Sequence, residues 1–167
     1  MILAVDVDYR DHCAYIAGVR FENWTDSNEN ETFVSILDHV DDYMPGQFYL
    51  RELPCILRLL EEHQLQPNYI VIDGFVYLDG KSKPGLGKYL YDALNHQVAI
   101  IGVAKKPFTG IPVACEVFRG SSKNPLYVTS AGVALDDAKT FIRSMHGDYR
   151  IPGLLKRVDQ VCRQKKE

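Results

Sequence analysis

The sequence predicts an α/β protein with a mixed sheet, in which an N-terminal antiparallel meander is followed by parallel strands flanked by helices. Two observations carry this prediction. Three β-rich stretches, residues 1–9, 13–21 and 32–37, follow one another with only turn or loop residues between them, which is typical of a meander. From residue 69 onward, strand patterns alternate with helical ones, which is typical of parallel α/β units.

The first strand is the stretch on which the functional argument depends. Residues 1–9 form an apolar, β-branched run that indicates a buried strand, yet Asp6 falls where that strand should still lie inside the sheet. A lone buried carboxylate is unfavourable unless it is paired or binds a metal. A second apolar strand, residues 69–74, contains Asp73 near its end. Two neighbouring strands with aspartates at their ends would form the oxygen-rich pocket that Mg²⁺ or Mn²⁺ prefers.

A helix is expected over roughly residues 53–62, because apolar side chains recur there at helical spacing. Pro54 is tolerable in the first turn of that helix, which leaves Glu52 at its beginning. Glu52 then has two interpretations. It projects toward the strand ends, or it is an ordinary first-turn residue favoured by the helix dipole.

The remaining pattern alternates, without a glycine-rich phosphate loop after the first strand. Further strands are predicted at residues 98–104, 113–118 and 126–129, and further helices at residues 87–95, 136–145 and 153–163. A meander followed by such units is the ribonuclease H-like architecture. In that architecture the metal site lies where carboxylates of the central strands meet residues from flanking helices.

Composition limits the class of protein. The 167 residues, 46% hydrophobic and 25% charged, are expected to form a single domain over residues 1–167 with an ordinary globular composition. No apolar run approaches the ~20 residues of a membrane span and no signal peptide is recognisable, so we expect a cytoplasmic protein with no membrane partner. The four cysteines are scattered, which favours neither a zinc site nor a disulfide framework. The net charge of −3 argues against a general nucleic-acid-coating protein but allows a local basic groove.

Eight short segments, in order along the chain, resemble those of endonuclease V, a metal-dependent nuclease that cuts a strand near deaminated purines such as inosine. They are residues 5–9 (VDVDY), 43–46 (YMPG), 50–54 (LRELP), 72–74 (IDG), 84–87 (PGLG), 101–106 (IGVAKK), 125–128 (PLYV) and 149–152 (YRIP). Each segment is weak alone, but their order and spacing together are specific.

The resemblance implies a set of catalytic residues. The metal-binding carboxylates would be Asp6, Glu52, Asp73 and Asp159, holding Mg²⁺, with Mn²⁺ able to substitute. Unaided, the sequence would place Asp159 on an exposed helix face. Lys105 matches the lysine near the scissile phosphate, where a compact cation stabilises developing charge; otherwise it is a strand-end lysine in solvent.

The resemblance also implies residues that bind the substrate. Tyr43, Met44 and Pro45 would form a strand-separating wedge, although a loop packed on the core is an equal alternative. The pocket for the flipped base would be built largely from backbone. Its candidate residues are Gly46, Phe48, Gly87 and Gly102.

The implied reaction is hydrolysis of a phosphodiester bond near a deaminated base in DNA or RNA, leaving a 3′-hydroxyl and a 5′-phosphate, by a monomer. The chain departs from the family pattern in two loops. Residues 75–84 form a longer stretch that lacks the family's histidine, and the insertion after Lys105 is reduced to residues 107–112. A second family histidine, after the strand at residues 126–129, is also absent. These departures leave open a second hypothesis, a catalytically lapsed nucleic-acid-binding or protein-interaction module on the same fold.

Overall fold

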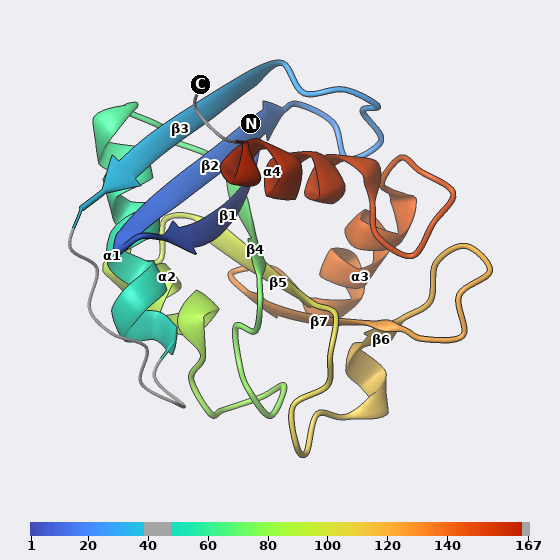
Figure 1. The fold of residues 1–167 in the computed structure, drawn as a ribbon. Coiled ribbons are helices and arrows are strands. Elements are labelled where there is room, and N and C mark those ends of the chain that lie inside the picture. Colours follow the sequence, from blue (N-terminus) through green and yellow to red (C-terminus); the bar gives the residue numbers. More distant parts are fainter. Residues whose placement is uncertain (39–47, 165–167) are drawn as a thin grey trace.

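The computed structural model describes residues 1–38 and 48–164 of the chain. Its strands are β1 (Ile2–Arg10), β2 (Cys13–Phe21), β3 (Glu31–Leu37), β4 (Tyr69–Asp73), β5 (Ala99–Ala104), β6 (Glu116–Val117) and β7 (Leu126–Ala131). Its helices are α1 (Phe48–Glu62), α2 (Leu86–Ala93), α3 (Leu135–Ser144) and α4 (Gly153–Arg163), with a short 3-10 helix, η1 (Val113–Cys115). Within these described residues the strands form one seven-stranded sheet in the order β3-β2-β1-β4-β5-β7-β6 (Figure 1).

The N-terminal meander is confirmed. β1 and β2 are antiparallel, with Arg10 opposite Cys13. They are joined by a two-residue turn in which Asp11 and His12 both have positive φ, 52° and 65°, as a type I′ hairpin requires. β3 pairs with β2, also antiparallel. The tight turn and the period-2 pattern together set the register of this hairpin.

The central strands β1, β4 and β5 are parallel neighbours, whereas β7 runs antiparallel to β5, and β6 antiparallel to β7. The predicted mixed sheet of the ribonuclease H-like class is therefore confirmed, whereas the expectation of parallel strands after the meander holds for β4 and β5 and is wrong for β6 and β7. The strand expected at residues 113–118 is reduced to β6, because η1 occupies its first half. Pro112 is the N-cap of η1, and its carbonyl accepts the Cys115 N–H at 3.0 Å, which closes a turn where a strand would remain extended.

The sheet carries a hydrophobic core on each face, and helices pack on both of these faces (Figure 1). Side chains alternate along β1, so that Ile2 and Ala4 pack on one side while Leu3 and Val5 pack on the other. The first core includes buried residues of α3 and α4, and the second includes buried residues of α1 and α2. The central strands are covered on both faces, which explains why their sequences are continuous apolar runs.

Helix α1 begins earlier than the sequence predicted. It starts at Phe48, so Pro54 lies in the helix interior and Glu52 is beyond the first turn. A proline costs a helix interior roughly 3 kcal/mol. Burial of an Ile or Leu side chain stabilises by about 1.5–3 kcal/mol, and α1 buries Ile56, Leu59 and Leu60. Tertiary packing therefore outweighs the local penalty. Among the described residues, no helix is both long enough and apolar enough to cross a membrane.

Two of the glycines predicted for the base pocket are buried and tightly packed. A Cβ on Gly102, in β5, would lie 2.6 Å from the carbonyl oxygen of Gly74 and 2.8 Å from Oγ1 of Thr129. A Cβ on Gly87, at the start of α2, would lie 2.8 Å from Cα of Val76. Both positions therefore allow the loop after β4 to approach β5 and α2 closely.

We expect Gly102→Ala to lower the free energy of unfolding by about 2–3 kcal/mol, because the added methyl group meets backbone that cannot move away cheaply. Gly153→Ala is the matched control. Gly153 begins α4 and its added methyl group would come no closer than 3.4 Å to the His146 carbonyl oxygen. Chemical denaturation of both variants measures the difference, and equal stabilities would contradict the packing argument.

Candidate functional site

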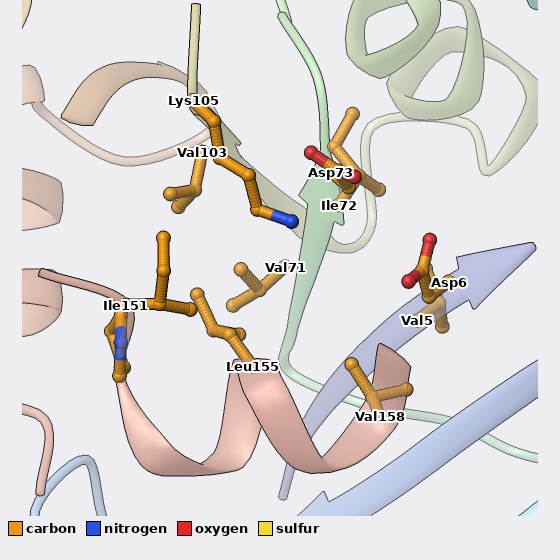
Figure 2. A pocket seen from close by; sticks show the side chains of 11 residues that line it. Val5, Asp6, Val71, Ile72, Asp73, Val103, Lys105, Ile151, Leu155 and Val158 are labelled. Atoms are coloured by element: carbon orange, nitrogen blue, oxygen red, sulfur yellow. The ribbon is translucent and has the colours of Figure 1, made fainter. Parts of the chain in front are cut away.

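Two aspartates lie at the carboxyl ends of neighbouring parallel strands. β1 and β4 are paired in the register Ile2 with Tyr69 through Ala4 with Val71. The same register, continued two residues further, places Asp6 opposite Asp73. Both side chains line one cleft beside α4 (Figure 2). The sheet therefore brings together the two carboxylates that the sequence singled out first.

Glu52 reaches this position from the opposite face of the sheet. It lies on α1 and lines a second, adjoining hollow together with Asp6 and Asp73. Because Glu52 is the fifth residue of α1, the helix-dipole interpretation of this glutamate is wrong: the dipole's effect falls off within the first turn. The long helix start carries Glu52 toward the strand ends instead.

Asp159 comes from α4 and completes the acidic cluster, by which we mean Asp6, Glu52, Asp73 and Asp159. Its carboxyl group lies within hydrogen-bonding reach of the Asp6 carboxyl. It also accepts a hydrogen bond from Nε of Arg163, one helical turn further along, at 2.7 Å. The alternative of a fully exposed helix residue does not hold, since the Asp159 side chain is only 32% exposed.

Burial and the neighbouring carboxylates raise the pKa values of three of the four carboxyl groups in the cluster. Burial raises the pKa of Asp6 to about 7, and the Asp73 charge and the Asp159 hydrogen bond add to the effect. Burial likewise raises the pKa of Glu52 to about 7, with repulsion from Asp73 and Asp6. Partial burial raises the pKa of Asp73, although the nearby Lys105 ammonium counteracts it. Burial alone would raise the pKa of Asp159, but the Arg163 and Asp6 hydrogen bonds lower it.

Among the described residues, the possible metal-ligand atoms that all lie within 4.8 Å of one another belong to Asp6, Asp159 and Cys162, and Glu52 and Asp73 are outside this group. Burial raises the pKa of the Cys162 thiol to about 12, and the thiol donates a hydrogen bond to the Asp159 carbonyl at 3.2 Å. A protonated thiol is a poor ligand. The available donors are thus carboxylate oxygens, which suit Mg²⁺ or Mn²⁺.

Lys105 directly follows β5. Its side chain lines the same cleft as Asp73, and its ammonium group points into this cleft (Figure 2). The backbone at this position is tied to the segment before α4. The guanidinium of Arg150 donates hydrogen bonds to the carbonyl of Lys105 and, at 2.7 Å, to that of Pro125. That segment is itself held by Arg119, which is 6% exposed and donates to four backbone carbonyls between residues 145 and 150.

Of the seven predicted substrate-binding residues, the structure describes only Gly87 and Gly102 in full. Tyr43, Met44, Pro45 and Gly46 lie outside the described residues, as does the side chain of Phe48. Gly87 and Gly102 are buried beside the loop after β4. Their packing explains why they are glycines, and their part in a base pocket stays a prediction.

Sequence analysis did not single out Arg119 or Arg163. The spacing of Asp159 and Arg163, four residues apart on a predicted helix, is a signal that could have identified this ion pair. No local signal exists for Arg119, because its partners lie 26 to 31 residues away in the sequence. Asp8 accompanies Asp6 along β1, but its carboxylate pairs with Nε of Arg10 at 3.0 Å.

The raised pKa of Asp6 leads to a prediction for the metal-free protein. The folded state binds this proton more tightly than the unfolded chain, so the carboxyl favours folding at low pH. That contribution is lost as the pH rises from the ordinary pKa of 3.8 through about 7. Asp6→Asn should therefore be more stable than wild type at pH 8, on the order of 2 kcal/mol, and show little gain near pH 4. Urea denaturation across this pH range, with the exposed Glu61→Gln as control, measures the difference; a gain independent of pH would contradict the prediction.

Comparisons with known proteins agree with this geometry. The family model described as Endonuclease V matches residues 1–122 of the chain. Endonuclease V of Streptomyces avermitilis is 32% identical over 145 residues, covering 73% of this chain and 61% of that protein. The chain thus spans less than two thirds of the length of this relative.

Solved structures show the same fold. The crystal structure of Streptomyces avermitilis endonuclease V aligns with a TM-score of 0.76 and 26% identity, covering 97% of this chain and 79% of that one. Endonuclease V of Ciona intestinalis, in complex with a 23mer DNA containing an inosine followed by a ribo-adenosine, aligns with a TM-score of 0.78 and 17% identity, covering 97% and 83%. A family model that covers most of the chain, together with this fold, shows that the protein belongs to the endonuclease V family.

Proposed function

We propose that this protein is a metal-dependent endonuclease that hydrolyses a phosphodiester bond near a deaminated base, such as inosine, in DNA or RNA, leaving a 3′-hydroxyl and a 5′-phosphate. The observation that carries the proposal is the convergence of four carboxylates, from β1, α1, β4 and α4, beside the ammonium group of Lys105. The inosine-containing DNA bound by the Ciona intestinalis relative supports this choice of substrate.

In this proposal the acidic cluster holds the metal. A bound Mg²⁺ would supply Lewis-acid chemistry there, namely activation of a water molecule and stabilisation of the leaving oxygen at phosphorus. The protein's part is to present Asp6, Glu52 and Asp73 as carboxylates from a rigid sheet and helix. Their raised pKa values mean that metal binding displaces protons, so affinity for the metal increases as the pH rises through about 7.

Lys105 has a separate role. Its ammonium group lies across the cleft from Asp6 (Figure 2), where it can contact a non-bridging phosphate oxygen and stabilise the charge that develops there. Because Arg150 holds the backbone carbonyl of Lys105, the cation is positioned by the same segment that leads into α4. The wedge of Tyr43, Met44 and Pro45, and the pocket of Gly46, Phe48, Gly87 and Gly102, would expose and hold the base.

One observation favours a second candidate, a binding module that has lost catalysis. Arg163 already occupies one oxygen of Asp159 at 2.7 Å, so the fourth carboxylate is partly neutralised without a metal. Arg163 is, however, 65% exposed, and exposed ion pairs contribute only about 0–1 kcal/mol. A divalent cation would displace such a partner easily, so the nuclease remains the better-supported function.

Metal binding is tested by thermal unfolding with increasing Mg²⁺ or Mn²⁺. At a concentration about a hundredfold above Kd, a ligand specific for the folded state stabilises by about 2.7 kcal/mol, which raises Tm by roughly 5–10 °C for a chain of this size. Asp73→Asn should lose most of this gain, whereas Asp137→Asn, an exposed aspartate on α3, should retain it. No metal-dependent shift in the wild type would remove the basis for the mechanism.

Catalysis is tested with end-labelled single-stranded DNA and RNA, each with and without one inosine. We expect metal-dependent cutting near inosine by the wild type and by Asp137→Asn, and a rate at least about 10²-fold lower in Asp73→Asn and in Lys105→Ala. Equal cutting of all strands would retain the nuclease but exclude base recognition. Metal binding without cutting would establish the binding module instead.

A further inference from the structure

Two loops pack against each other beside the acidic cluster. The first, residues 75–84, follows β4 directly after Asp73 and Gly74, and the second, residues 105–112, begins at Lys105. The rings of Phe75 and Phe108 meet edge to face, with centroids 6.3 Å apart and an interplanar angle of 65°. A Cβ on Gly80 would lie 2.9 Å from Cδ of Pro112. The two loops thus form one continuous surface, which we call the two-loop surface.

The first loop is held in one conformation by Asp79. Its carboxylate accepts the backbone N–H groups of Lys81, Ser82 and Lys83 at 3.0, 2.8 and 2.9 Å, and the Ser82 hydroxyl at 2.9 Å. The backbone closes the loop further, because the Leu78 N–H donates to the Lys83 carbonyl at 2.8 Å. The lysine side chains therefore project from a defined backbone.

The charge of the two-loop surface is opposite to that of the whole chain. It carries four exposed lysines, Lys81, Lys83, Lys105 and Lys106. Its one acidic residue is Asp79, whose carboxylate is already engaged by the four hydrogen bonds, while the chain has a net charge of −3. Within the described part of the chain, none of these lysines belongs to an ion pair. Four unpaired cations beside an aromatic pair are suited to a polyanion with flat apolar groups.

Phe108 is the exposed aromatic of this surface. Its side chain keeps 37% of its surface accessible, and Nζ of Lys83 lies 5.3 Å from the ring centroid. Phe75 supports the ring from one side. Phe108 is three positions after Lys105 in the chain, so their Cα atoms are at most ~11 Å apart. A base next to the phosphate at Lys105 is therefore within reach of the Phe108 ring.

We propose that the two-loop surface is a stacking platform for single-stranded nucleic acid, on which an unpaired base beside the cut phosphate stacks on Phe108 while the lysines contact the backbone. Aromatic rings and clustered cations are the two elements that bind single strands without regard to sequence. The inference rests on the proposed function only in taking the partner to be a nucleic-acid strand. DNA and RNA share the chemistry that the platform recognises.

The platform is tested by fluorescence anisotropy with labelled, unmodified single-stranded DNA, single-stranded RNA and duplex DNA, in EDTA so that no cutting occurs. Phe108→Ala and Phe108→Leu should each weaken single-strand binding by about tenfold, because leucine keeps the apolar volume but lacks a flat face. Phe108→Trp should bind at least as tightly as the wild type. Phe118→Ala is the matched control, since Phe118 is 53% exposed but follows β6, outside the two-loop surface.

The lysines are tested by the salt dependence of binding. Loss of one phosphate contact lowers the slope of log K against log salt by about 0.7 for a single strand, so we expect Lys83→Gln to do this. The exposed Lys123, on the loop between β6 and β7, provides the control Lys123→Gln with an unchanged slope. Equal losses of affinity for single-stranded DNA and single-stranded RNA in the platform variants support a shared platform. A loss of affinity for only one of the two would restrict the partner to that nucleic acid and overturn the shared platform.

The outcomes separate this inference from the proposed function. Wild-type affinity in Phe108→Ala and Phe108→Leu, with Tm values showing that both fold, overturns the platform even when inosine-dependent cutting is found. An equal loss of duplex binding also overturns it, because stacking needs an unpaired base. Single-strand binding that depends on Phe108 in a protein that never cuts would keep the platform and reject the nuclease.

Discussion

The parallel register of β1 and β4 is the constraint on which the rest of the structure depends. It brings Asp6 and Asp73 together at one edge of the sheet, where burial and the charge of Asp73 disfavour the charged form of Asp6. Such a cluster is unfavourable in the metal-free protein, and burial of apolar side chains on both faces of the sheet must offset it. In the proposed function a bound cation would neutralise the acidic cluster, which is why this cluster, rather than any apolar cavity, is the basis of the proposal.

The helices and loops around this edge of the sheet each contribute one further side chain to the site. Helix α1 tolerates an interior proline and thereby carries Glu52 to the cleft, while α4 contributes Asp159 from the other face. The loops after β4 and β5 surround the same edge, and Arg150 ties Lys105 to the segment before α4. The side chains of the site come from both faces of the sheet and are held at a small number of backbone positions. The site is therefore more rigid than a site made of loops alone.

Much of the fold follows from local patterns. The meander, the central strands and the span of α4 could be predicted, because period-2 and helical spacing are visible in the sequence and set which face is buried. The start of α1 and the strand at residues 113–118 could not, because packing decided the first and a proline-capped turn the second. The roles assigned to Asp6, Glu52, Asp73, Lys105 and Asp159 remain predictions about chemistry, although the structure brings all five to one place.

The sequence by itself determined most of the elements, the two strand-end aspartates and the family, because each depends on short runs of residues whose pattern survives without coordinates. Only the tertiary structure decided that Glu52 lies beside Asp6 and Asp73, that Arg163 pairs with Asp159, and that Phe75 meets Phe108. The physical reason is that proximity between distant segments depends on sheet register and on how helices pack, and neither is encoded at any one position.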